Sequence, residues 1–170
     1  MNIIVLQHIK IEDPGYIKDL MLADGLDLTT IELDEGEKIP KDLSKFDGMF
    51  CMGGPMDTFM EKDYPWLIDE KKAIKDFVIN LKKPYLGFCL GCQLLGEVVG
   101  GKVVKSQPAE IGIMDINFSN EKDEDKLFSK FPNTIKSLQW HSYEVQGIEN
   151  NKDITLLAVS YTHLTLPTKA

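Results

Sequence analysis

The chain has 170 residues, with 27 acidic and 19 basic side chains, and its net charge at neutral pH is −8. This negative balance argues against nucleic acid and against an anionic membrane surface as partners. A hydrophobic fraction of 43% with 27% charged residues is typical of a globular protein. The length suits a single domain that buries roughly 70% of its surface on folding.

The sequence contains no candidate for a membrane-spanning helix. The longest uncharged stretch, Pro84–Gly96, is shorter than the about 20 apolar residues that a membrane-spanning helix needs. Residues 1–8 lack the basic start and the small-residue cleavage site of a signal peptide, so we expect a cytoplasmic protein. Three cysteines, an odd number, argue against a disulfide framework.

Strands and helices are predicted to alternate up to residue 100. Short apolar runs predict strands at 3–6, 28–33, 48–52 and 84–89. Helices are predicted after the first, third and fourth strands, at about 14–23, 65–81 and 91–99. Asp13 and Pro14 are the expected N-cap and first residue of the first helix.

The helix at 65–81 has the clearest amphipathic pattern. Its apolar stripe consists of Leu67, Ile74, Phe77, Val78 and Leu81. The side chains expected to face away from the core are Glu70, Lys71, Lys75 and Lys82.

The pattern changes beyond Gly101. Strand-like pieces are predicted at 102–105, 112–118 and 137–145, with one small helix near 125–131. The earlier alternation predicts the fold class: an α/β three-layer sandwich whose central sheet is mostly parallel, with helices on both faces.

The last residues differ from the rest of the chain. The string Val159–Thr168 resembles one reading frame of a transposon-end adapter used in sequencing libraries, and Ala158 and Lys169 are compatible with that frame. The alternative is a genuine tail of β-prone residues. We expect a partial domain over residues 1–158, incomplete at its C-terminus, and a non-native tail over 159–170.

The segment Gly87-Phe88-Cys89-Leu90-Gly91 has the pattern of a nucleophile elbow with Cys in place of Ser. It lies between a predicted strand and a predicted helix, where that motif belongs. The helix N-terminus favours a thiolate, so we expect a lowered pKa for Cys89. Stabilisation of an oxyanion needs two backbone N–H groups, and Leu90 together with the loop Gly53-Gly54 offers them.

Cys89 and Cys92 have a competing interpretation as a C-x-x-C redox pair or half of a zinc site. For zinc, the remaining candidate ligands are Cys51, His8 and His141. Neither alternative explains the two glycines around Cys89, and we expect no metal and no organic cofactor. Cys51 lies within an apolar run and is expected to be a small core residue.

The extended elbow, through Gln93, resembles the glutaminase signature of class I glutamine amidotransferases, in the branch similar to the glutaminase domain of GMP synthase. Further segments resemble this branch in the same order along the chain: Ile4–His8, Met52–Met56, Tyr64–Leu67, Glu110–Gly112 and Trp140-His141.

The resemblance implies that the glutamine side-chain amide is hydrolysed through a cysteinyl thioester on Cys89, with backbone N–H groups near Gly54 and Leu90 holding the oxyanion. It also implies substrate contacts, which are expected from Gly53, Gln93, Trp140, His141, Ser142 and Tyr143. The chain departs from many relatives after the histidine, where they carry Gly-Asp and this sequence carries Ser142-Tyr143.

The family's His-x-Glu motif, which supplies the general base and its orienting carboxylate, has no counterpart in the sequence. His141 matches a substrate-side position or is a hydrogen-bonded structural residue. His8 is expected to be structural, and His163 lies in the suspected tail. We therefore expect little or no glutaminase activity from this chain.

Two alternatives remain open: a catalytically silent binding module of the same fold, and another Cys-elbow hydrolase such as a γ-glutamyl peptidase. The expected ligand is glutamine or a γ-glutamyl small molecule. An ammonia-accepting synthetase is not identified by the sequence, which contains no P-loop.

Overall fold

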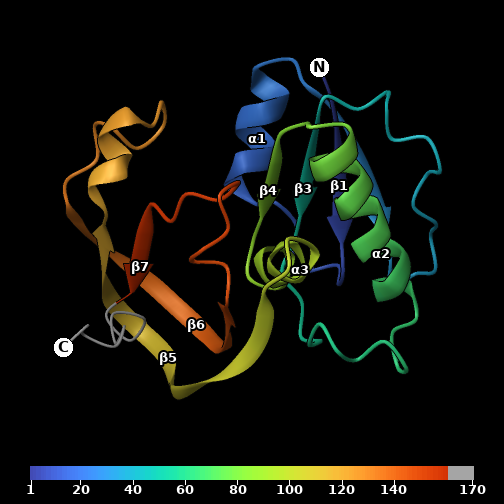
Figure 1. Cartoon of the computed structure of the whole chain (residues 1–170). Helices are drawn as coiled ribbons and strands as arrows, with labels where there is room; N and C mark the ends of the chain where they lie inside the picture. The colour runs from blue at the N-terminus through green and yellow to red at the C-terminus, as the bar shows by residue number, and fades with distance from the viewer. Residues whose placement is uncertain (161–170) are drawn as a thin grey trace. The chain divides into compact units, whose positions relative to one another are not determined.

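The computed structural model describes residues 1–160, and the chain divides into two compact units, the first spanning Met1–Gly101 and the second beginning at Lys102. The first unit contains a four-stranded sheet, drawn in Figure 1. All its strands are parallel, in the order β2-β1-β3-β4. They are β1 (Asn2–Gln7), β2 (Asp27–Glu32), β3 (Gly48–Cys51) and β4 (Tyr85–Gly87). The parallel sheet predicted from the alternating pattern is confirmed.

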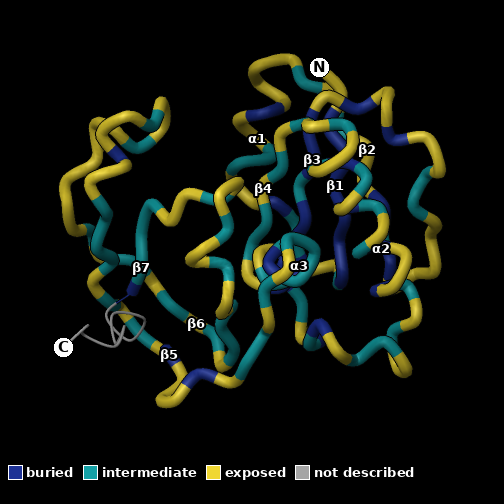
Figure 2. Tube along the Cα trace, viewed as in Figure 1, coloured by how far each residue is buried: buried dark blue, intermediate teal, exposed yellow. Residues whose placement is uncertain are grey.

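Three helices cover the two faces of this sheet: α1 (Tyr16–Ala23), α2 (Trp66–Lys75) and α3 (Leu90–Val98). Because side chains alternate along a strand, the residues of β1 pack on both faces of the sheet. Ile4 and Leu6 join a buried cluster with residues of α2 and α3, whereas Ile3 and Val5 join a second cluster with Met21 of α1. The first unit therefore has the expected layers of helix, sheet and helix, and β1 is buried along most of its length (Figure 2).

The strand order creates a switch point between β1 and β3. The chain leaves β1 toward one edge of the sheet and leaves β3 toward the other, and in open α/β sheets ligands bind beside the carboxyl ends of such strands. His8 comes directly after β1, and Gly53-Gly54 comes shortly after β3. The residues that follow these two strands are thus brought together at one end of the sheet.

The first helix begins two residues later than predicted. Gly15 rather than Asp13 is its N-cap, with a φ of 55° that favours glycine. The Gly15 N–H donates to Asp13 Oδ1 at 2.9 Å. Asp13 therefore forms a turn ahead of the helix and does not cap it.

The second helix continues as a π-helical turn over Asp76–Asn80, so the two together cover most of the predicted helix at 65–81. The prediction for two of its charged residues was wrong. Glu70 is fully buried and Lys71 is partly buried. Leu67, Glu70 and Ile74 share the buried side of the helix because their spacing of three and four residues places them on one face.

The second unit contains an antiparallel sheet in the order β6-β5-β7, formed by β5 (Lys102–Phe118), β6 (Thr134–Gln146) and β7 (Ala158–Ser160). The predicted strands at 102–105 and 112–118 are one long strand whose register shifts between Lys105 and Glu110. No element of this unit is buried as deeply as β1 within the described residues.

The prediction of a helix near 125–131 was wrong. A short 3-10 helix over Asn120–Glu124 precedes this segment, which itself forms turns. Asp125 Oδ1 accepts hydrogen bonds from the N–H groups of Leu127 and Phe128, at 2.8 and 3.0 Å. These are the bonds of an N-cap, and the Ser129 N–H donates to the Asp125 carbonyl at 3.1 Å, so the segment forms a capped turn that does not extend into a helix.

Of the suspected tail, Val159 and Ser160 belong to β7, and residues 161–170 lie outside the described residues. The non-native origin of this segment stays a prediction. Between residues 1 and 160, no helix is long and apolar enough to cross a membrane.

Candidate active site

Cys89 occupies a sharp turn between β4 and α3. It is the N-cap residue of α3 and has a φ of 47°, in the left-handed region that non-glycine residues rarely adopt. A Cβ atom on Gly87 would lie 2.6 Å from the backbone nitrogen of Cys92, and one on Gly91 would collide with the backbone of Cys51. Both flanking positions therefore require glycine, as the elbow motif predicts.

Two backbone hydrogen bonds join the turn to the end of β3. The Phe88 N–H donates to the Cys51 carbonyl at 2.9 Å, and the Gly91 N–H donates to the Met52 carbonyl at 3.2 Å. The Gly53-Gly54 turn follows directly, and a Cβ built on Gly53 would lie 3.6 Å from the Cβ of Cys89. The elbow and the glycine turn are consequently neighbours.

The oxyanion-hole candidates lie close to the thiol. The backbone N–H of Leu90 favours the thiolate of Cys89 and so acts to lower its pKa. A Cβ on Gly54 would lie 3.3 Å from Leu90 Cδ2, so the glycine turn packs against the first residue of α3. The structure thus brings Cys89, Leu90, Gly53 and Gly54 together, while their roles toward a substrate stay predictions.

The expected low pKa of the nucleophile was wrong. Desolvation by neighbouring residues raises the pKa of the Cys89 thiol, and the negative charge of Glu12 raises it further. The hydrogen bond from the Leu90 N–H acts in the opposite direction but is outweighed. A helix N-terminus favours a thiolate only where burial and nearby anions do not oppose it.

Glu12 is a site neighbour that the sequence did not reveal. It is half-buried, it lies beside Gly53, and its charge acts on both Cys89 and His8. Glu12 lies between the first strand and the first helix, with no motif around it that would identify its role.

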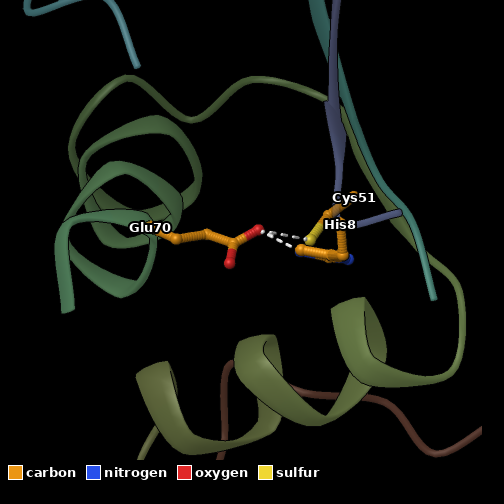
Figure 3. A group of neighbouring side chains, drawn as sticks. All are labelled: His8, Cys51 and Glu70. Carbon is orange, nitrogen blue, oxygen red and sulfur yellow. Dashed lines mark hydrogen bonds and ion pairs between the residues drawn. The ribbon is translucent and has the colours of Figure 1, made fainter. Parts of the chain in front are cut away.

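A fully buried polar cluster of His8, Cys51 and Glu70 lies beside the glycine turn (Figure 3). His8 Nε2 and Glu70 Oε1 are 2.8 Å apart, and His8 Nδ1 is 2.9 Å from the carbonyl oxygen of Gly53. Cys51 Sγ donates to the same Glu70 oxygen at 3.2 Å. Cys51 is thus the core residue that the sequence predicts, and it has a polar partner as well.

Burial opposes a charge on His8, but the hydrogen bond and the charge of Glu70, assisted by the Gly53 carbonyl, outweigh it and raise the pKa of the imidazole. A protonated His8 donates from both ring nitrogens, which accounts for both contacts. These contacts match the prediction that His8 is not the general base. With both nitrogens occupied, it is not free to serve as a base for Cys89.

The metal alternatives have limited support. His8, Cys51 and Glu70 offer donor atoms within 4.8 Å of one another, yet the ion pair and the thiol hydrogen bond already join these atoms. Cys89 and Cys92 are free thiols, and both are exposed. Neither belongs to a group of three or more possible metal donors among the described residues.

The remaining predicted substrate residues lie on α3 and on β6. Gln93 is half-buried on the first turn of α3, where its N–H donates to the Cys89 carbonyl at 3.1 Å. Trp140, His141, Ser142 and Tyr143 all belong to β6, in the second unit. Their contacts with a substrate stay predictions.

Within the second unit, His141 has well-defined polar partners. Its Nε2 lies 2.9 Å from the buried carboxylate of Glu110, directly across the strand pair, and its Nδ1 lies 3.0 Å from the Tyr143 carbonyl. These contacts match the interpretation of His141 as a hydrogen-bonded structural residue, and they do not test a substrate role.

A cysteine on a strained strand-to-helix turn, beside a glycine turn in an α/β fold, defines a nucleophile-elbow protein. The family model described as glutamine amidotransferase class-I matches residues 16–165. The chain therefore belongs to the class I glutamine amidotransferase family, as the sequence motifs indicate.

Individual relatives agree with this membership. A glutamine-hydrolyzing GMP synthase subunit from Sulfolobus acidocaldarius is 33% identical over 129 residues, which cover 76% of this chain and 62% of that protein. Gamma-glutamyl peptidase 3 from Arabidopsis thaliana is 32% identical over 125 residues, covering 70% of this chain and 47% of the relative.

Among solved structures, a glutamine amidotransferase from Thermotoga maritima matches with a TM-score of 0.78 and 27% identity. The match covers 86% of this chain and 62% of the Thermotoga chain. The chain thus spans less than two thirds of the length of both this structure and the Sulfolobus relative.

Proposed function

We propose that the fold serves hydrolysis of the glutamine side-chain amide to glutamate and ammonia, with Cys89 as the nucleophile. The observation that carries this proposal is the placement of Cys89 on the strained elbow with the Gly53-Gly54 turn beside it. Membership of the glutamine amidotransferase family supports glutamine as the substrate.

In the proposed reaction, the Cys89 thiolate attacks the amide carbon and forms a tetrahedral oxyanion that accepts hydrogen bonds from the Gly54 and Leu90 N–H groups. The C–N bond then breaks and the nitrogen leaves as ammonia after gaining a proton. Water attacks the thioester, the C–S bond breaks, and glutamate leaves with the thiol restored.

The proton transfers require a general acid and base, and His8 is engaged by Gly53 and Glu70. We therefore expect the chain to bind and acylate slowly and to release little ammonia. Robust ammonia release would contradict the expectation that the base is missing, although it would support the proposed chemistry.

A direct test uses the chloromethyl ketone analogue of glutamine, which places a ketone where the amide would bind. We expect it to alkylate Cys89 at least about tenfold faster than chloroacetone does, because a formed pocket raises the local concentration of the reagent. Peptide mass spectrometry assigns the labelled cysteine, and excess glutamine should protect it.

Cys89→Ala is the matched control and should leave only slow labelling of Cys51 and Cys92. Preferential labelling of either of those residues in the parent chain, or no advantage over chloroacetone, would contradict the proposal.

A γ-glutamyl peptidase is the second candidate, supported by the similarity to the Arabidopsis relative. The same chloromethyl ketone fits both functions because both use a γ-glutamyl group. Protection of Cys89 by a γ-glutamyl dipeptide at lower concentration than glutamine would favour the peptidase.

If the chain is an amidotransferase, its ammonia needs an acceptor. The Sulfolobus relative is named as one subunit of GMP synthase, which supports a separate synthetase chain in that role. The described residues do not identify which synthetase it is.

A further inference from the structure

The His8–Glu70 pair is buried without being an obvious source of stability. Both side chains are fully buried, and their 2.8 Å contact joins the end of β1 to α2. Removing two charges from water costs about as much as their attraction returns, so a buried pair contributes little net stability. The other contact of His8, with the Gly53 carbonyl, links the pair to the loop beside Cys89 and indicates a role in orienting that loop.

The Gly53 carbonyl and the Gly54 N–H belong to the same peptide unit. This unit is planar and trans, so the two groups point in opposite directions. A hydrogen bond that fixes the carbonyl therefore also fixes the direction of the N–H. His8 Nδ1 holds this carbonyl at 2.9 Å, and the Gly54 N–H is one of the expected oxyanion donors.

The imidazole is itself held on several sides. Its ring stacks on Trp66, with centroids 5.4 Å apart and planes 16° apart. Glu70 Oε1 fixes the opposite ring nitrogen, and Cys51 Sγ fixes that carboxylate oxygen at 3.2 Å. Figure 3 shows Glu70 reaching from α2 toward the other two side chains. A Cβ on Gly54 would come within 2.9 Å of His8 Cβ, so the turn packs directly on the base of the imidazole.

We propose that the His8–Glu70 pair is a positioning device for the oxyanion hole, which orients the Gly53-Gly54 peptide so that the Gly54 N–H faces the carbonyl oxygen of a substrate on Cys89. His8 and Glu70 are positioning residues, since neither touches the reacting atoms. The inference rests on the proposed function and adds to it the source of the loop's orientation.

The test compares two reagents on Cys89. The chloromethyl ketone analogue of glutamine reacts through a tetrahedral oxyanion, whereas iodoacetamide reacts by direct displacement and forms none. We therefore divide the limiting alkylation rate at saturating analogue by the rate with iodoacetamide, and this ratio reports the oxyanion hole. Saturation removes differences in binding, and a change in thiol reactivity alone affects both rates and cancels.

The principal variant is the double substitution His8→Phe with Glu70→Gln. Phenylalanine keeps a ring against Trp66 but has no N–H donor, and glutamine avoids leaving a buried charge unpaired. Deleting an oxyanion donor costs about 10²–10³ in rate, and a misdirected donor costs less, so we expect the ratio to fall about tenfold. An unchanged ratio in a folded variant would overturn the inference.

A matched pair of variants does not depend on the phenylalanine protein folding. In the Glu70→Gln background, His8→Asn places an amide N–H at the position of Nδ1, toward Gly53, whereas His8→Gln places one at the position of Nε2, toward residue 70. We expect the asparagine variant to keep the ratio within about threefold of the parent and the glutamine variant to lose it, since only the former holds the carbonyl. Indistinguishable ratios in the two variants would overturn the inference.

The parent chain separates this inference from the proposed function. If the parent shows no preference for the glutamine analogue, the proposed function fails. If the parent shows the preference and all three variants retain it, the function stands and the positioning role is refuted.

Discussion

The thiol of Cys89 lies in surroundings that favour its protonated form. Burial raises its pKa, and the carboxylate of Glu12 adds to that effect. Glu12→Gln removes the negative charge, so the pKa of Cys89 should fall and the thiolate should form at lower pH. We expect the pH profile of Cys89 alkylation by iodoacetamide, followed on the peptide by mass spectrometry, to move to lower pH.

Asp13→Asn is the control for this prediction. It removes the same charge one residue along the chain and keeps the oxygen that accepts from the Gly15 N–H. A profile that stays in place for Glu12→Gln, or one that moves equally for both variants, would refute the specific effect of Glu12.

At the scale of single residues, the elbow turn could be predicted from the sequence because its signal is local. Gly87, Cys89 and Gly91 are close in the chain, and the turn itself requires the two glycines. The pKa of the thiol could not, because it depends first on burial in the folded chain and then on Glu12, which is distant in sequence. Glu70 had a usable signal in its helical spacing from Leu67 and Ile74, but its charge argued for the surface.

Because α3 lies close to β3, Gly91 is the elbow position with the least room for a side chain. A Cβ there would collide with the backbone carbonyl oxygen of Cys51. Backbone atoms cannot move aside as the end of a flexible side chain can. We expect Gly91→Ala to lower the free energy of unfolding by about 1–3 kcal/mol, as overpacking in a tight core does. Urea denaturation followed by circular dichroism measures this change.

Gly48→Ala is the matched control on β3. Its Cβ would meet the end of the Ile3 side chain at 2.9 Å, which can rotate away, so we expect a smaller loss of stability. Equal losses in the two variants would show that the backbone contact of Gly91 is unimportant.

At the scale of elements, apolar runs located the central parallel strands well because β1 and β3 are buried on both faces. The edge strands β2 and β4 are more exposed. The segment 125–131 was mispredicted: Asp125 caps its first turn as it would cap a helix, but the chain then continues only in turns. The long strand β5 was predicted as two because Pro108 and Gly112 interrupt its pattern. The register shift between Lys105 and Glu110 lets the strand continue past the proline.

Taken as a whole, the molecule exposes an apolar face on the second unit. Ile111 pairs with Trp140 and Ile113 pairs with Leu138, and alternation along the strands places all four on the same side. They are between 60% and 74% exposed. Contiguous apolar surface of this kind binds hydrophobic dyes. We expect the chain to enhance the fluorescence of anilinonaphthalene sulfonate, and Ile113→Glu with Leu138→Lys to remove roughly half or more of it.

Leu127→Lys is the control, because Leu127 is 76% exposed but lies in a turn away from those strands. A fall in dye fluorescence as large as that of the double variant would mean that the dye reports general exposure and not this face. The division into two units could not be predicted from the sequence, because it depends on how the strands after Gly101 pair with one another.

The positive φ of Cys89 has an evolutionary consequence. A non-glycine residue in this region carries strain of about 1–3 kcal/mol, which the surrounding structure must offset. Glycine would adopt the same turn without that strain, so selection for stability alone would replace the one side chain that makes the turn reactive. The positive φ of Cys89 is therefore an observation, independent of any motif, that supports the proposed role of its thiol.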